Sequence, residues 1–257
     1  MNSNKTNKLP TEKIQKTLSN QGLGSRRELE TWISAGRIRV NGQIAKLGDR
    51  ISLEDRVEVD GRRIYFEAQK DMLPRVLLYY KPEGEVCSRS DPEKRRTVFE
   101  SLPRVGLGRW IMVGRLDLNT SGLLLFTTDG GLANFLMHPS HEVEREYAVR
   151  ILGGLTPAQI SMLKQGVMLE DGLAKFLSLE EQAGEGANRW YHVVLKEGRN
   201  REIRRMFDAL GLQVSRLIRV RYGPFTLPAS LSRGRRMEFS VEEVKDFLKQ
   251  LGYKAKR

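Results

Sequence analysis

Short apolar runs, bounded by glycine and polar residues, dominate the pattern of the chain after residue 75. The runs at residues 76–80, 110–113, 123–126 and 190–195 each predict a buried strand. Alternating patterns at residues 144–149 and 214–222 predict two more strands, the second with arginines between its apolar positions. Apolar stripes at helical spacing predict helices near residues 132–136 and 200–211. This mixture favours an α+β fold.

The first 66 residues carry a different and smaller pattern. A helix is predicted from about residue 10, and Ser25 with Glu28 forms a capping-box pattern that begins a second helix. Asn41-Gly42 and Asp60-Gly61 are hairpin turn signals. Four arginines fall at one helix–strand corner of this module: Arg26, Arg27, Arg37 and Arg39.

The pattern also predicts where the domains begin and end. We expect a disordered N-terminus at residues 1–9, a small domain at 10–66, a polar linker at 67–74, a larger domain at 75–252 and a basic tail at 253–257. Within the larger domain, Thr156-Pro157 and the capping-box pattern of Ser240 with Glu243 predict two further helix starts.

The charge balance indicates a polyanionic partner. The chain has 44 Lys and Arg against 32 Asp and Glu, a formal net charge of +12 and a pI of about 9.9. Nucleic acid is the partner we expect, because the arginine guanidinium forms paired hydrogen bonds with phosphate. Arginines cluster late in the chain, at Arg199, Arg201, Arg204, Arg205, Arg216, Arg219 and Arg221. A single cysteine, Cys87, and no apolar leader segment favour a cytoplasmic protein without a membrane anchor.

A glycine-bracketed polar loop holds one aspartate next to the core. Asp117 lies between Gly114 and Gly122, and the apolar run at residues 123–126 follows at once. Such a loop could hold a carboxylate rigidly in a cleft. The alternative is that Asp117 caps a turn or pairs with Arg115.

The sequence lacks the residues that several other kinds of catalytic or binding site require. One cysteine and three histidines disfavour a zinc site, and no phosphate-binding or dinucleotide-binding glycine loop is present. Asp117 and Asp129 flank a strand about 13 Å long at ~3.3 Å per residue, which makes them a poor glycosidase pair. A lone aspartate is left as the candidate nucleophile.

Two segments resemble known families. The first segment covers about residues 10–65 and resembles the small RNA-binding domain shared with ribosomal protein S4. This resemblance rests on the glycines and arginines of residues 18–28 and on the stretch 33–42. Residues 75–222 are similar to the pseudouridine synthases of the RsuA/RluB type, in the branch acting on large-subunit ribosomal RNA. Four segments in the family's order carry this similarity: residues 80–84, 114–130, 145–147 and 197–206.

The second resemblance implies a fold and a chemistry. The fold would be a mixed, mainly antiparallel twisted sheet with flanking helices. The uridine C–N bond would break, the base would turn, and a C–C bond would form, without cofactor or metal. Asp117 would be the catalytic aspartate, Tyr147 would stack on the flipped base, and Arg204 would pair with Asp117, with Arg201 and Arg205 as rivals. We expect RNA contacts at Arg26, Arg27, Arg37, Arg39, Lys81, Arg115, Asn119, Thr120, Arg199, Arg201 and Arg205, and pocket contacts at Leu116 and Leu195.

The sequence therefore favours a monomeric, cytoplasmic enzyme that converts one uridine of 23S ribosomal RNA, free or in a pre-ribosomal fragment, to pseudouridine. Two alternatives stay open. One keeps the chemistry and changes the substrate to small-subunit ribosomal RNA. The other is a non-catalytic RNA-binding or ribosome-assembly protein on the same fold.

Overall fold

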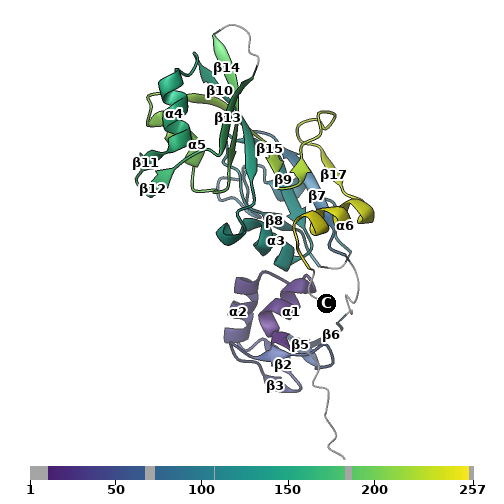
Figure 1. Cartoon of the computed structure of the whole chain (residues 1–257). Coiled ribbons are helices and arrows are strands. Elements are labelled where there is room, and N and C mark those ends of the chain that lie inside the picture. The colour runs from purple at the N-terminus through teal and green to yellow at the C-terminus, as the bar shows by residue number, and fades with distance from the viewer. Residues whose placement is uncertain (1–10, 67–72, 107, 183–186, 255–257) are drawn as a thin grey trace, which may run out of the picture. The chain divides into compact units, whose positions relative to one another are not determined.

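The computed structural model of the 257-residue chain describes residues 11–66, 73–106, 108–182 and 187–254 (Figure 1). The chain divides into two compact units, one with Met1–Met72 and Arg104–Trp110, the other with Leu73–Pro103 and Ile111–Lys256. The predicted N-terminal disorder, most of the predicted linker and the end of the predicted tail lie outside the described residues. The domain boundaries therefore stay predictions. The hydrophobic pattern does not indicate that residues 104–110 belong to the first unit.

The first unit combines two helices with a four-stranded sheet of order β3-β2-β5-β6. Its elements are β1 (Glu12–Lys13), α1 (Ile14–Asn20), α2 (Arg26–Ser34), β2 (Ile38–Val40), β3 (Gln43–Ile44), β4 (Arg50–Ile51), β5 (Val57–Val59) and β6 (Arg62–Ile64). Both helices share one apolar core with the sheet, in which Leu18, Leu29 and Val57 are fully buried. The capping box of Ser25 and Glu28 is confirmed. The first helix begins later than predicted, because residues 12–13 pair with β4.

Gly22 lies very close to the backbone of Gly108, another residue of the first unit. Its backbone has a φ of +86°, and a Cβ atom there would lie 2.7 Å from the carbonyl oxygen of Gly108. A side chain at position 22 would therefore collide with the neighbouring backbone as well as strain its own.

The second unit is built on a nine-stranded sheet whose main path is β13-β14-β10-β15-β9-β7-β17. Its strands are β7 (Val76–Lys81), β8 (Ile111–Val113), β9 (Ser121–Thr127), β10 (Arg145–Leu152), β13 (Ser178–Gln182), β14 (Asn188–Leu195), β15 (Val214–Tyr222), β16 (Phe225–Thr226) and β17 (Arg236–Glu238). Among the described strand pairs of this sheet, β9 and β15 run parallel and the others antiparallel. The predicted mixed, mainly antiparallel sheet is confirmed.

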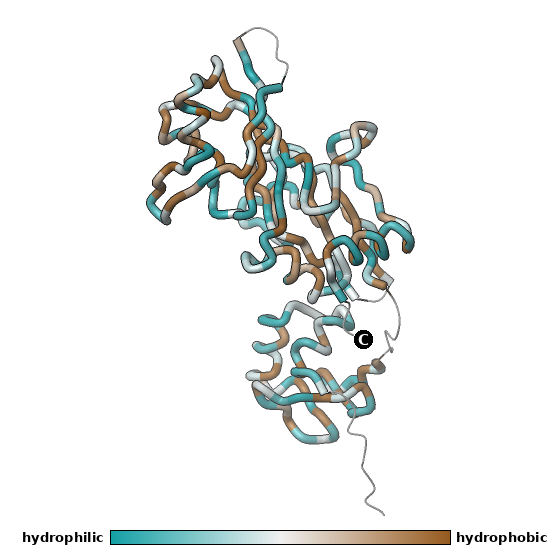
Figure 2. The backbone as a smooth tube through the Cα atoms, in the orientation of Figure 1, coloured by the Kyte–Doolittle hydropathy of each residue, from teal (hydrophilic) through white to brown (hydrophobic). Residues whose placement is uncertain are grey.

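Helices, short 3₁₀ turns and one hairpin complete the second unit. The remaining elements are the 3₁₀ turns η1 (Val98–Ser101) and η2 (Pro139–His141), the helices α3 (Gly130–Met137), α4 (Pro157–Gln165), α5 (Glu202–Asp208) and α6 (Val241–Gln250), and the hairpin of β11 (Val167–Leu169) and β12 (Gly172–Ala174). One apolar core joins β7 and β9 to α3 and α6, and Figure 2 shows hydrophobic positions concentrated along these central strands. Helix α5 is shorter than predicted, because Arg201 before it is left-handed, with a φ of 47°. No described helix is long and apolar enough to cross a bilayer.

Candidate active site

The aspartate loop, residues 114–120, connects two antiparallel strands, the partly buried β8 and the fully buried β9. β8 delivers the chain to Gly114, and β9 takes it up again at Ser121. Val113 and Leu123 at the two ends are almost completely buried, so the ends of the loop are anchored in the core. Inside the loop, the backbone N–H of Thr120 donates to the carbonyl of Asp117 at 3.1 Å. The predicted strand–loop–strand arrangement around a partly exposed Asp117 is confirmed.

Lys81 holds this loop from inside the protein. Its side chain at the end of β7 is fully buried. The ammonium Nζ donates to the carbonyl oxygens of Pro82 and Thr120 at 2.9 Å, of Asp117 at 3.1 Å and of Leu118 at 3.4 Å. Burial lowers the pKa of this ammonium. The donors of Lys81 are thus occupied by backbone carbonyls inside the protein, and the RNA contact expected at this residue stays a prediction.

Arg204 also contacts the loop backbone. The buried guanidinium on α5 donates to the carbonyl of Asn119 at 2.7 Å and to that of Val214 at 2.8 Å. In the described structure, no ion pair joins the Asp117 carboxylate to Arg204, Arg201 or Arg205. Arg204 and Asp117 therefore attract each other over a longer distance than an ion pair. Burial lowers the pKa of Arg204.

A cleft of about 900 Å³ opens beside the aspartate loop. Tyr147 on β10 and Leu195 at the end of β14 are both more than 90% buried and line it together with Asp117. The predicted site residues that line the cleft are Arg115, Leu116, Asp117, Thr120, Tyr147, Leu195, Arg199 and Arg201. A second hollow of about 430 Å³ is lined by Asn119, Arg201 and Arg204. Asp117 and Tyr147 are therefore brought together, as the sequence predicts.

Thr120, another residue at which an RNA contact is expected, is only 2% exposed. Its hydroxyl has no hydrogen-bond partner among the described residues, and the residue lines the cleft. A contact from Thr120 would therefore be made deep in the cleft.

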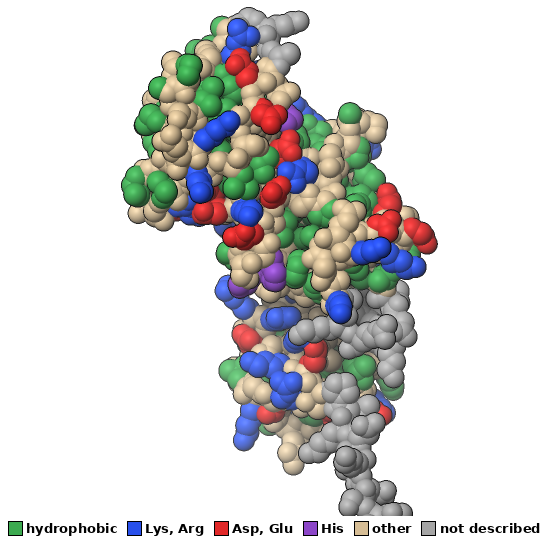
Figure 3. All heavy atoms as spheres, viewed as in Figure 1, with side chains coloured by type: hydrophobic (Ala, Val, Ile, Leu, Met, Phe, Trp, Pro, Cys, Tyr) green, Lys and Arg blue, Asp and Glu red, His purple; other side chains and the backbone are tan. Residues whose placement is uncertain are grey.

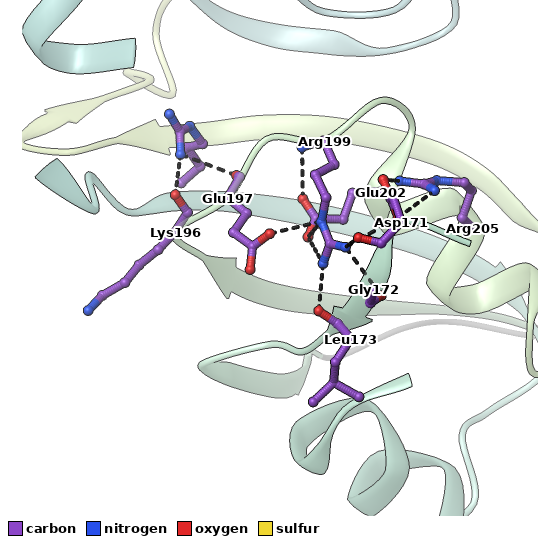
Figure 4. A network of polar contacts seen from close by, with 9 residues as sticks. Asp171, Gly172, Leu173, Lys196, Glu197, Arg199, Glu202 and Arg205 are labelled. Carbon is purple, nitrogen blue, oxygen red and sulfur yellow. Dashed lines mark hydrogen bonds and ion pairs between the residues drawn. The ribbon is translucent and has the colours of Figure 1, made fainter. Parts of the chain in front are cut away.

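Arg199 and Arg205 belong to an internal polar network (Figure 4). The Arg199 guanidinium donates to the backbone carbonyls of residues 171, 172 and 173 and forms ion pairs with Glu197 and Glu202. Arg205 holds the Asp171 carboxylate with two hydrogen bonds, at 2.8 and 2.9 Å, and this bonding lowers the pKa of Asp171. Burial raises the pKa of Glu202. Both arginines join the α5 region to the β11–β12 hairpin, and the RNA contacts expected at them stay predictions.

Two arginines that are not among the predicted site residues also line the cleft. Arg145 and Arg219 are 8% and 2% exposed, and their guanidinium carbons lie 4.9 and 5.0 Å from the centre of the Tyr222 ring. One signal was present, since Arg219 follows Leu217 by two residues on a strand and so shares its buried face.

The four predicted arginines of the first unit, which we call the N-terminal corner, are exposed. Figure 3 shows Lys and Arg side chains across the visible face of this unit. Arg37 is paired with Asp60 through two hydrogen bonds and lies over the Trp32 ring, 4.6 Å from its centre. The side chains of Arg26 and Arg27 have no ion pair or hydrogen bond among the described residues. These two are free to bind phosphate.

Comparison with known proteins decides the family. Residues 75–209 match the family described as RNA pseudouridylate synthase, and residues 12–57 match the S4 domain. The chain belongs to the RNA pseudouridylate synthase family. Both resemblances stated from the sequence are thereby confirmed.

Similar proteins extend the match over most of the chain. A relative from Pseudomonas aeruginosa named ribosomal large subunit pseudouridine synthase B is 54% identical over 244 residues, which cover 95% of this chain and 63% of the relative. A relative of the same name from Escherichia coli is 55% identical over 243 residues, which cover 94% of this chain and 83% of the relative. The chain thus spans less than two thirds of the first relative's length.

A solved pseudouridylate synthase shares the fold. It aligns with a TM-score of 0.62 at 23% identity and covers 91% of this chain and 99% of its own. At this identity the likeness shows a shared fold and says nothing about the roles of individual residues.

Proposed function

We propose that this chain isomerises a uridine of large-subunit ribosomal RNA to pseudouridine, with the Asp117 carboxylate as the reacting group. One observation carries the proposal. Of the carboxylates that line the cleft among the described residues, Glu197 and Glu202 are ion-paired with Arg199, whereas Asp117 has no ion pair. Asp117 is therefore the carboxylate that is available to a substrate.

The proposed reaction breaks and remakes one bond to the same ribose. The C1′–N1 bond breaks, the base turns, and C5 bonds to C1′. Three roles for Asp117 fit its position: attack on the sugar, attack on the base, or removal of a ribose proton. Tyr147 stacks on the flipped base, and Leu116 and Leu195 close the apolar part of the pocket. Extrusion of the base from its stack costs a few kcal/mol, which contacts to neighbouring phosphates offset.

RNA binding is assigned to two regions. The N-terminal corner binds phosphates in a salt-dependent manner, with Arg26 and Arg27 as its free groups and Arg39 beside them. Arg115 and Arg201, at the cleft, bind phosphates next to the target nucleotide. We further propose residues 10–66 as the RNA-binding domain and 75–252 as the catalytic domain, acting as a cytoplasmic monomer.

The names of the two relatives favour 23S ribosomal RNA as the substrate. The test is release of tritium from transcripts that carry 5-tritiated uridine, because formation of the C5–C1′ bond expels the C5 hydrogen. We expect stoichiometric release from a large-subunit fragment and none from small-subunit RNA. Release from small-subunit RNA alone would reverse the substrate assignment. Tight binding without release from either RNA would mean a non-catalytic binding protein.

A further inference from the structure

Arg219 is a buried arginine that forms no ion pair in the described structure. Its Nε donates to the carbonyl of Leu123 at 2.8 Å, and the residue is 2% exposed. Its Nη2 is buried and has no hydrogen-bond partner, and no described carboxylate forms an ion pair with it. Burial of a charged donor without an acceptor is unfavourable, so a bound substrate is expected to supply one.

The sheet places β15, which carries Arg219, between β10 with Tyr147 and β9, which follows the aspartate loop. Arg219 is the register partner of Tyr147 on β10 and of Gly122 on β9, directly after the aspartate loop. Cross-strand partners present their side chains on the same face of a sheet, and Arg219 and Tyr147 both line the cleft. A Cβ at Gly122 would lie 2.3 Å from the Arg219 carbonyl oxygen, so the absence of a side chain there permits this close approach.

Arg145 provides the contrast. Its guanidinium donates to the carbonyls of Lys196 and Glu197 and to the Tyr222 hydroxyl, and none of its nitrogens is both buried and without a partner. Arg219 shares the Tyr222 ring, but a ring face is a weak acceptor for an N–H group. Arg204 and Arg205 also have a buried Nε without a partner, but of the described arginines that line the cleft, Arg219 is the one with an open buried donor.

We propose that Arg219 is a catalytic residue whose Nη2 donates a hydrogen bond to a carbonyl oxygen of the target uracil and holds the negative charge of the detached base. This inference rests on the proposed function. When the C1′–N1 bond breaks, its electron pair stays on the base, and the charge spreads over N1, O2 and O4. C5 then bonds to C1′ with an electron pair of this anion. The proton on C5 is lost, N1 gains a proton, and the product is an isomer of uridine.

A donor that is already in place where charge develops lowers the barrier without reorganisation, and removal of one such donor typically costs about 100-fold or more in rate. Because the charge appears only after cleavage begins, the donor acts on the rate and little on the affinity for RNA.

The test compares two transcripts of the same ribosomal RNA fragment, one made with uridine and one with 5-fluorouridine. Fluorine withdraws electrons and stabilises the detached base, so this substrate depends less on Arg219. We expect Arg219→Leu to slow consumption of the uridine transcript by about 100-fold under saturating single-turnover conditions, and that of the fluorinated transcript by about tenfold or less. The Kd for RNA should change less than about threefold.

The ratio of the two rates within one protein preparation does not depend on how much of the variant is folded. Arg219→Lys, which keeps the charge, should show a smaller difference between the transcripts than Arg219→Leu. The matched control is Arg150→Leu, since Arg150 on β10 bonds Ser215 and lies 5.8 Å from the Trp190 ring centre, outside the residues lining the cleft. It should consume both transcripts at wild-type rates.

Equal slowing of both transcripts by Arg219→Leu would mean that Arg219 only supports the structure of the site, which would overturn the inference. A loss confined to Kd would instead make it a phosphate ligand, which also overturns it. If the wild-type protein fails to isomerise uridine in the tritium assay, the proposed function itself fails. An active wild type with equal slowing refutes only the role of Arg219.

Discussion

The cations of the N-terminal corner and those beneath the aspartate loop differ in what their side chains contact. Arg26 and Arg27 are exposed and have no side-chain partner among the described residues. Lys81 and Arg204 are buried and donate to backbone carbonyls of the loop. Under the proposed function, the exposed cations bind RNA, whereas the buried cations hold the aspartate loop in place. A substitution in one region should change affinity, and a substitution in the other should change rate.

Lys81→Met should give the largest effect. The change leaves several buried carbonyls of the loop without a donor, and we expect the free energy of unfolding to fall by about 3 kcal/mol. A displaced Asp117 should cost about 100-fold or more in single-turnover rate. Urea denaturation and tritium release measure the two losses. Lys164→Met, at an exposed lysine of α4, is the control, and a Lys81→Met protein as stable and active as this control would refute the support role.

Arg204→Gln should lower the rate by about 100-fold while the Kd for RNA stays within about threefold. The neutral side chain loses both the hold on the Asn119 carbonyl and the attraction to Asp117. Arg204→Lys should recover part of the rate, because it restores the charge. The measurements are saturating single-turnover kinetics and filter binding. A weakened Kd with an unchanged rate would move Arg204 into the RNA-binding group.

Arg26→Gln combined with Arg27→Gln should act on binding alone. We expect roughly tenfold weaker binding at moderate salt and a slope of log Kd against log salt that is smaller by about 1 to 2. The saturating single-turnover rate should be that of wild type. Arg56→Gln removes one charge from the same unit at a guanidinium that is already paired with Glu58, and its effect on the slope should be smaller. An unchanged salt slope for the double variant would contradict the proposed role of the N-terminal corner in binding phosphate.

Asp60→Asn should give the smallest effect, and it depends on pH. The hydrogen bonds from Arg37 hold the pKa of Asp60 below its usual value of 3.8. The stability that this pair contributes is therefore present above pH 3.8 and is lost as the pH falls through the lowered pKa. The Tm difference between wild type and Asp60→Asn should shrink below pH 3.8. A difference that stays constant down to pH 2 would mean that the pair contributes nothing.

Much of the fold follows from local sequence rules. The capping boxes at Ser25 and Ser240, the helix start at Thr156 and the strands around Asp117 were all predicted and are confirmed. These features depend on residues a few positions apart, so a single sequence contains them.

The roles of the buried cations could not be predicted in the same way. Lys81 meets a loop 36 to 39 positions further along the chain, and Arg204 meets a carbonyl 85 positions earlier. A lysine at the end of a strand followed by a turn is typical of a surface site. Only the packing of β7 against β9 reveals that the Lys81 side chain points inward.

Asp117→Asn tests the central claim most directly. The substitution keeps the shape of the side chain and removes the charge, while the carbonyl of residue 117 still accepts from Lys81. Tritium release from the large-subunit transcript should fall below detection, with the Kd and its salt slope unchanged. A variant that binds this RNA and still converts uridine to pseudouridine would contradict the account.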